Sequence, residues 1–157
     1  MQMMLCDRTY PELRDMLAGK KVLVWTCNTC ARLCDVGGAD NASALAAKLR
    51  EDGIDAVAAA AVAASCIASN IRKCQTEISG DFDTIVALTC DIGSALVRTV
   101  SGKETVNPVA TVGTGYRDDA RRCIVSGHGT GKDIPLSEEA ARRGLRTGPL
   151  VRPPSII

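Results

Sequence analysis

The sequence has few aromatic side chains, one histidine and no excess of charge of either sign. Aromatic residues make up 3% of the 157 positions, so alanine and valine must supply much of the packing, and stacking platforms for single-stranded nucleic acid are lacking. The 19 basic and 18 acidic side chains nearly cancel, which argues against a nucleic-acid partner or an anionic membrane surface. A single histidine, His128, serves poorly for Cys–His or Ser–His–Asp catalysis.

Long apolar runs are also missing. No stretch reaches the roughly 18 apolar residues of a membrane-spanning helix. The start, MQMMLCDRTY, has neither the basic region nor the apolar region of a signal peptide. We therefore expect a cytoplasmic protein without membrane insertion. The length suits one domain over residues 1–157, with a core at about 9–115 and a glycine-rich, extended segment at 116–157.

Cysteine, in contrast, is abundant: the chain has eight. In a reducing compartment, clustered cysteines more often indicate metal or redox chemistry than disulfides. Three of the eight, Cys27, Cys30 and Cys34, fall within eight positions, directly after an apolar run and shortly before Gly37 and Gly38. The other five are spread singly along the chain: Cys6, Cys66, Cys74, Cys90 and Cys123.

Strand and helix patterns alternate along the first three quarters of the chain. Apolar, β-rich runs predict strands at 21–26, 55–62, 82–90 and 107–113. Caps and apolar periodicity predict helices at 9–19, 40–53, 66–78, 92–100 and 135–145. This order predicts an α/β fold of Rossmann or flavodoxin-like kind, with an open parallel sheet of about four strands and helices on both faces.

The strand ends bring cysteines together. Cys27 ends the first predicted strand, Cys66 follows the second and Cys90 ends the third. Because the carboxyl ends of parallel strands share one edge of a sheet, where open α/β sheets bind ligands, we expect the two loop cysteines to join them there. The resulting candidate site contains five thiols: Cys27, Cys30, Cys34, Cys66 and Cys90.

The spacing C-x2-C-x3-C allows three sulfurs to surround one centre, with a distant cysteine as the fourth ligand. Iron–sulfur clusters are held in this way, and a four-cysteine zinc site needs the same ligands. The sequence therefore predicts a metal site at the carboxyl edge of the sheet and leaves iron–sulfur and zinc open.

Other interpretations of these residues remain. Single cysteines are often small buried hydrophobes. The stretch WTCNTC is similar to a thioredoxin-like dithiol, although Trp25 is displaced by one residue and a third cysteine follows. The glycines of CDVGG and SGHGTGK do not match a G-x-G-x-x-G or P-loop pattern, so they favour turns over phosphate binding. Cys123 with His128 is a further possible pair of metal ligands.

Together, the KKVLV strand, the C-x2-C-x3-C-x2-GG stretch, the GID before the second strand, and Cys66 and Cys90 resemble a known family. Over about residues 10–115 the chain resembles the methylenetetrahydrofolate reductase C-terminal-type domain, the small partner of the flavin-dependent reductase of acetogens and related anaerobes. The resemblance assigns Cys27, Cys30 and Cys34 to the metal motif and Cys66 or Cys90 to the distant ligands. Family members often continue into a second cysteine-rich segment, whereas here Cys123 stands alone, which argues against a second cluster.

The resemblance implies a subunit without chemistry of its own that carries one [4Fe–4S] cluster and transfers electrons to a flavoprotein reductase subunit. The alternative is a zinc-stapled structural or assembly module without redox activity, and a weaker one is a thiol–disulfide oxidoreductase. A homo-oligomer is compatible with either. The end of the chain, GPLVRPPSII, is expected either to pack on the partner or to be disordered.

Overall fold

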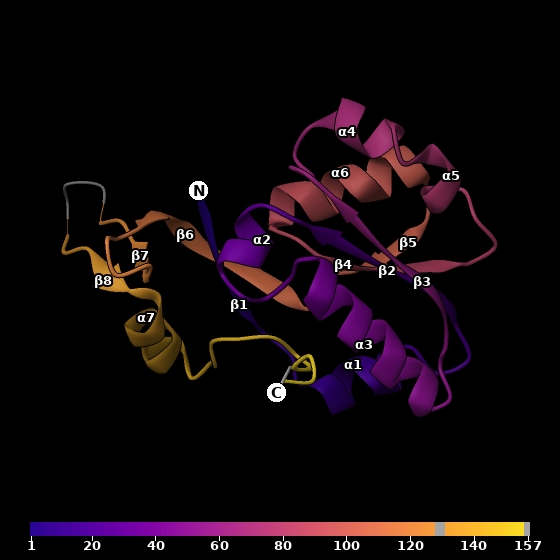
Figure 1. Cartoon of the computed structure of the whole chain (residues 1–157), viewed down its shortest axis with the longest axis horizontal. Helices are drawn as coiled ribbons and strands as arrows, with labels where there is room; N and C mark the ends of the chain where they lie inside the picture. The colour runs from indigo at the N-terminus through magenta and orange to yellow at the C-terminus, as the bar shows by residue number, and fades with distance from the viewer. Residues whose placement is uncertain (128–130, 156–157) are drawn as a thin grey trace.

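Two β-sheets form the framework of the chain (Figure 1). The computed structural model describes residues 1–127 and 131–155. The parallel sheet contains, in spatial order, β3 (Asp55–Val62), β2 (Lys21–Cys27), β4 (Thr84–Leu88) and β5 (Glu104–Val106). The antiparallel sheet contains, in spatial order, β1 (Gln2–Cys6), β6 (Val109–Arg117), β7 (Cys123–Val125) and β8 (Ile134–Pro135).

Helices cover both faces of the parallel sheet (Figure 1). On one face lie α1 (Tyr10–Met16) and α3 (Ala39–Glu51), and on the other lie α4 (Ala68–Arg72), α5 (Gln75–Ile78) and α6 (Asp91–Ser101). The short α2 (Cys30–Leu33) follows β2, and α7 (Leu136–Arg143) packs beside β7 and β8. The predicted α/β fold with a parallel sheet of four strands and helices on both faces is therefore confirmed.

The side chains of β2 alternate between two apolar cores. Val22 and Val24 face α1 and α3, in a core that continues into the antiparallel sheet. Leu23 and Trp25 face α4, α5 and α6. This two-sided burial is the reason that the run KVLVWT is apolar throughout instead of alternating with polar residues.

The predicted fourth parallel strand at 107–113 is wrong. The fourth parallel strand is β5, and the residues after it form β6, which pairs antiparallel with β1. Pro108 separates the two strands. Proline has no backbone N–H to donate to a sheet and restricts the residue before it, so the parallel pairing ends at Val106 and the chain enters the second sheet at Val109.

The first residues of the chain contribute to the core. Met3, Met4 and Leu5 of β1 are fully buried, between the parallel and antiparallel parts of the molecule. The sequence pattern gave no strand here, because the run is short and contains no β-branched or aromatic residue. The helix predicted at 66–78 is interrupted near Cys74 and forms the two short helices α4 and α5.

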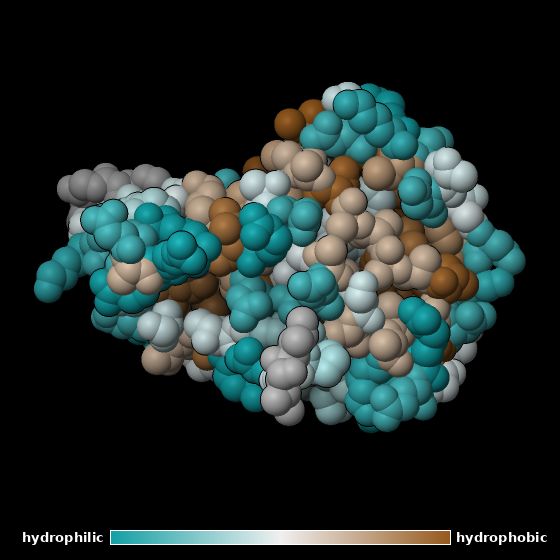
Figure 2. All heavy atoms as spheres, in the orientation of Figure 1, coloured by the Kyte–Doolittle hydropathy of each residue, from teal (hydrophilic) through white to brown (hydrophobic). Residues whose placement is uncertain are grey.

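Strand β3 lies at an edge of the parallel sheet and leaves much of its surface exposed. Its alanine-rich sequence presents small apolar side chains, and Figure 2 shows apolar residues gathered over this strand on the face toward the viewer. A register shift between Val22 and Leu23 interrupts its pairing with β2 near Val57. Such irregularities reduce the tendency of an edge strand to pair with another chain.

Gly37 and Gly38 form a tight turn between α2 and α3. A Cβ atom at Gly37 would lie 2.6 Å from Thr26 Oγ1 and 3.0 Å from the Leu88 carbonyl oxygen, and Gly38 has a φ of 95°. The Gly38 N–H donates to Thr26 Oγ1 at 2.7 Å, and the Ala39 N–H donates to Asn28 Oδ1 at 3.2 Å. These amides at the N-cap and first residue of α3 thus bond to side chains of the chain itself, which supports a turn over a phosphate loop.

Replacing Gly37 by alanine should destabilise the fold. Its new methyl group would meet both Thr26 and the β4 backbone, and we expect the free energy of unfolding to fall by about 1–3 kcal/mol. Gly131→Ala is a matched control, because a Cβ there has no neighbour within 4 Å among the residues that the structure describes. It should leave the free energy of unfolding within about 0.5 kcal/mol or raise it slightly. Urea unfolding followed by circular dichroism measures both, and equal stabilities would contradict the tight packing of Gly37.

Within residues 1–127 and 131–155, none of the helices combines the length and the apolar character needed to cross a membrane.

Candidate functional site

The order of the parallel strands places two cysteines at adjacent strand ends. The chain forms β2 first, continues to β3 on one side of it, and then crosses to β4 on the other side. Cys27 is the last residue of β2, and Cys90 follows β4 as the N-cap of α6. In open α/β sheets, the carboxyl edge at such a change of direction is where ligands bind.

Three cysteines are neighbours at this edge. Cys27 and Cys90 are nearly buried, and Cys30, the first residue of α2, is half-buried. Burial raises the pKa of the Cys90 thiol, and the neighbouring thiols of Cys27 and Cys30 raise it further. Each of the three comes from a different segment: the end of β2, the start of α2 and the start of α6.

Backbone amides at the start of α6 partly offset this effect. The backbone N–H groups of Ile92 and Gly93 lie near the Cys90 sulfur and lower its pKa. Hydrogen bonds from backbone amides favour the thiolate, and the thiolate is the form of cysteine that binds metals. The surroundings of Cys90 therefore suit a thiolate whose negative charge is balanced by a bound metal cation.

Cys66 lies on the loop after β3, and its side chain is exposed. Its neighbour Ser65 is fixed in place, because Trp25 Nε1 donates to Ser65 Oγ at 2.8 Å. A Cβ at Gly93 would lie 2.9 Å from the Ser65 Cβ, so this loop packs directly against the first turn of α6. The backbone of Cys66 is thereby held at the same edge as Cys90, with its thiol toward solvent.

Cys34 lies at the end of α2 and faces the antiparallel sheet. Its thiol is 4% exposed and donates to the Gln2 carbonyl oxygen at 3.5 Å. Burial raises the pKa of Cys34 to about 12, and the neighbouring thiols of Cys123 and Cys30 act in the same direction. Cys34 therefore lies between the three converging thiols and a partner on β7.

Cys123 is also a member of this thiol group, whereas the sequence pattern grouped it only with His128. Its thiol donates to the Leu33 carbonyl oxygen at 3.3 Å, so it lies against the last turn of α2. The sequence near Cys123 does not predict its contact with Leu33, because the two residues are far apart in the chain. They meet because β7, which carries Cys123, pairs with β6. The possible pairing of Cys123 with His128 is untested, since His128 lies outside the described residues.

The thiols are not arranged around a metal position as they stand. Across residues 1–127 and 131–155, no three side chains of His, Cys, Asp or Glu are close enough together to hold a metal ion. In chemical terms the converging donors are all thiols, which suits an iron–sulfur cluster or zinc. Binding either one requires the side chains of Cys27, Cys30 and Cys90 to turn toward a common point and a fourth sulfur to join them.

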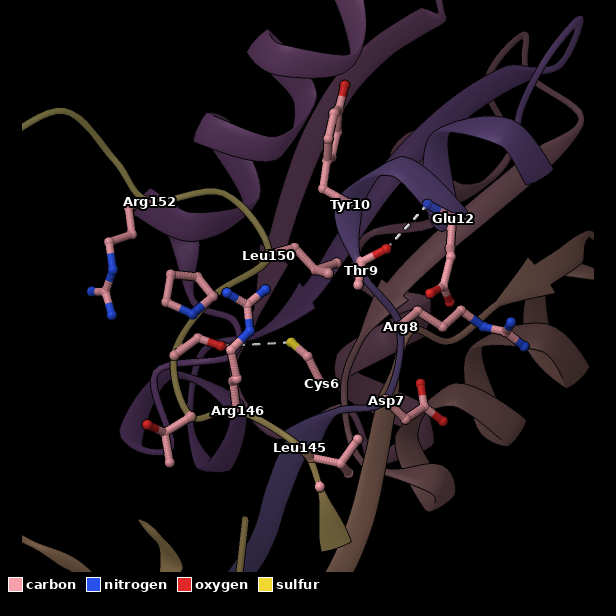
Figure 3. Close-up of a pocket in the computed structure, with 14 residues that line it drawn as sticks. Cys6, Asp7, Arg8, Thr9, Tyr10, Glu12, Leu145, Arg146, Leu150 and Arg152 are labelled. Carbon is pink, nitrogen blue, oxygen red and sulfur yellow. Dashed lines mark hydrogen bonds between the residues drawn. The ribbon is translucent and has the colours of Figure 1, made fainter. Parts of the chain in front are cut away.

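A hollow of about 430 Å³ lies around Cys6, away from Cys27, Cys30 and Cys90 (Figure 3). The Cys6 thiol donates to the Gly148 carbonyl oxygen at 3.6 Å, and burial raises its pKa to about 11. In Figure 3, Arg8 and Arg152 point away from Cys6 on opposite sides. The charged groups of this hollow do not converge on one point, so we do not assign it a ligand.

The C-terminal segment closes over this hollow. Cys6 forms an isolated β-bridge with Arg146, and Leu150 and Val151 pack against the core. In the structure the tail thus lies against the chain itself up to Ser155, which differs from the expected disorder, while its docking on a partner stays a prediction. Proline-bearing sequence indicates extended backbone but does not specify the surface on which it lies, and here that surface is the chain itself.

Comparison with known proteins gives no match: neither a family model, nor a curated protein, nor a solved structure is similar to the chain. The resemblance to the methylenetetrahydrofolate reductase C-terminal-type domain thus remains a prediction from the motif. The structural support for a function comes from the arrangement of the thiols.

Proposed function

We propose that the chain is an accessory subunit that binds one [4Fe–4S] cluster and transfers electrons to a flavoprotein reductase. The observation that supports this proposal is that Cys27, Cys30 and Cys90 are neighbours at the carboxyl edge of the parallel sheet. These three thiols come from the strand ends and the loop that the C-x2-C-x3-C motif occupies. Three thiols in one place suit the soft thiolate ligation of a metal.

In this proposal Cys27, Cys30 and Cys90 hold three positions of the cluster, and Cys66 or Cys34 supplies the fourth. The cluster, when bound, supplies one-electron transfer. The amides of Ile92 and Gly93 lie near the Cys90 sulfur, and hydrogen bonds from backbone amides stabilise the added negative charge of a reduced centre. The half-buried Cys30 and the exposed Cys66 place this edge near the surface, where an electron-transfer partner needs to approach.

The visible spectrum of protein purified without oxygen tests the cluster. We expect broad absorbance near about 400 nm that bleaches with dithionite, together with iron and sulfide in elemental analysis. A colourless protein that contains zinc would contradict the electron-transfer proposal and support the alternative, a zinc-stapled structural module. A protein with neither metal that forms a reversible Cys27–Cys30 disulfide would support a thiol–disulfide oxidoreductase instead.

The resemblance adds a specific partner to this proposal, a flavin-dependent methylenetetrahydrofolate reductase-like protein. Mixing the dithionite-reduced chain, after removal of excess reductant, with such a flavoprotein should bleach the flavin absorbance. A loaded and reduced chain that leaves the flavin oxidised would argue against this partner while leaving the metal site intact. The partner and the metal are thereby tested separately.

A further inference from the structure

A second hollow of about 350 Å³ lies on the other side of α2, between this helix, the β6–β7 turn and the C-terminal segment. Its lining includes Cys34 and Cys123, and the Cys123 thiol donates to the carbonyl oxygen of Leu33, the residue next to Cys34. It also includes four arginines, Arg117, Arg121, Arg122 and Arg152, against one lining acid, Asp35. A pair of thiols thus lies in a setting of excess positive charge.

The arginines differ in how far they are already engaged. Arg122 pairs with Asp118 at 2.8 Å, and Arg117 donates to the Arg121 carbonyl oxygen. Arg152 lies 4.0 Å from Asp35, and both side chains are largely exposed. Among the described residues, the guanidinium of Arg121 makes no hydrogen bond or ion pair, so the hollow has at least one cation available for an anionic ligand.

The two thiols also differ in access. Cys34 is 4% exposed and is enclosed by β1 and α2, whereas Cys123 is half-buried on β7. A small reagent entering the hollow meets Cys123 first, and Cys34 is in contact behind it. Pairs of this kind, with one accessible and one shielded sulfur in contact, are suited to thiol–disulfide exchange.

We propose that Cys34 and Cys123 form a redox-active dithiol whose oxidant is an anionic low-molecular-weight disulfide bound by the arginines of this hollow. The Cys123 thiolate attacks one sulfur of the small disulfide, whose S–S bond breaks and releases one small thiol. The Cys34 sulfur then attacks Cys123 in the mixed disulfide, loses its proton to solvent, and releases the second small thiol. In sum, the protein dithiol loses two electrons and two protons, and the small disulfide gains them.

This dithiol is separate from the metal site of the proposed function. If Cys34 serves Cys123, the fourth metal position falls to Cys66. The inference does not depend on a bound metal. The metal content of the Cys34→Ala variant shows whether Cys34 belongs to the dithiol or is a metal ligand. Metal retained in this variant agrees with the dithiol assignment, whereas metal lost shows that Cys34 is a ligand and overturns it.

Glutathione disulfide, which carries carboxylates, and cystamine, a cationic disulfide, are the probes. The full chain is incubated with each without oxygen, the remaining thiols are alkylated, and the peptides are mapped by mass spectrometry. We expect a Cys34–Cys123 disulfide that forms about tenfold faster with glutathione disulfide than with cystamine, after correction for the reactivity of each reagent toward free cysteine. The exposed Cys66 should give only a mixed disulfide.

Charge and thiol variants complete the test. Arg121→Gln should slow the reaction with glutathione disulfide severalfold and leave the cystamine reaction unchanged, while Arg72→Gln on α4 should change neither. Cys123→Ser should abolish the link, and Cys74→Ser should leave it intact. A link between other cysteines, equal corrected rates with the two reagents, or an Arg121→Gln effect on both reagents would overturn the proposal.

Discussion

Replacing Cys30 by serine is expected to abolish metal binding and leave the chain folded. Cys30 contributes one of the three converging thiols, and a serine hydroxyl is a poor substitute for a thiolate toward iron or zinc. Because Cys30 is half-buried at the start of a short helix, the free energy of unfolding of the metal-free chain should change by less than about 1 kcal/mol. Metal content should fall from one centre per chain to background, measured by elemental analysis after anaerobic purification.

Cys74→Ser is the matched control for this loss. Cys74 is also half-buried, but it lies between α4 and α5 and packs against the core on the face of Trp25. Its metal content should equal that of the unmodified chain. Metal retained in Cys30→Ser, or lost equally in both variants, would show that the three converging thiols are not the ligands.

The position of these thiols follows from the path of the chain. Parallel strands need crossover connections, so every strand in such a sheet ends at the same edge, and a cysteine at a strand end is brought there automatically. That is why the strands at 21–26, 55–62 and 82–90 were enough to anticipate that Cys27 and Cys90 would be neighbours. The effect of the Ile92 and Gly93 amides on the pKa of Cys90 could not be predicted from the sequence. It depends on Cys90 being the N-cap of α6, and the sequence does not locate the start of a helix to a single residue.

The pairing of β1 with β6 in the second sheet escaped prediction because it is not local. The run 107–113 was correctly read as a strand, but its sequence does not state which strand it joins. Its partner, β1, lies at the opposite end of the chain and gives only a short, methionine-rich apolar run. Pro108 was the one residue that indicated a break between the sheets.

Contacts between distant parts of the chain also explain why the predicted cluster of five thiols is divided, with Cys34 apart from Cys27, Cys30 and Cys90. Sequence spacing groups Cys34 with Cys27 and Cys30, since all three follow β2 within one loop. The single turn of α2 changes this, because it directs Cys34 toward β1 and β7 while Cys30 remains near Cys90. The contact with Cys123 depends on the antiparallel sheet, so it could be found only after β6 and β7 were placed.

Trp25→Ala should be the most destabilising single change in the parallel sheet. Trp25 is the largest of the fully buried side chains and fills the core between β2 and the helices α4, α5 and α6. Truncating a buried tryptophan costs about 3–5 kcal/mol, a large part of the 5–15 kcal/mol that stabilises a typical domain. We expect the urea midpoint, measured by circular dichroism, to fall steeply or the chain to be unfolded without denaturant.

A milder variant separates packing from hydrogen bonding at this position. Trp25→Phe keeps most of the apolar volume but removes the N–H that donates to the buried Ser65 Oγ, and it should cost about 1–3 kcal/mol. Val57→Ala on the exposed edge of β3 is the control and should change the free energy of unfolding by no more than about 0.5 kcal/mol. Because Ser65 holds the loop that carries Cys66, Trp25→Phe should also increase hydrogen exchange in residues 64–67. Unchanged exchange there would show that the loop is held by its packing on Gly93 and not by the indole hydrogen bond.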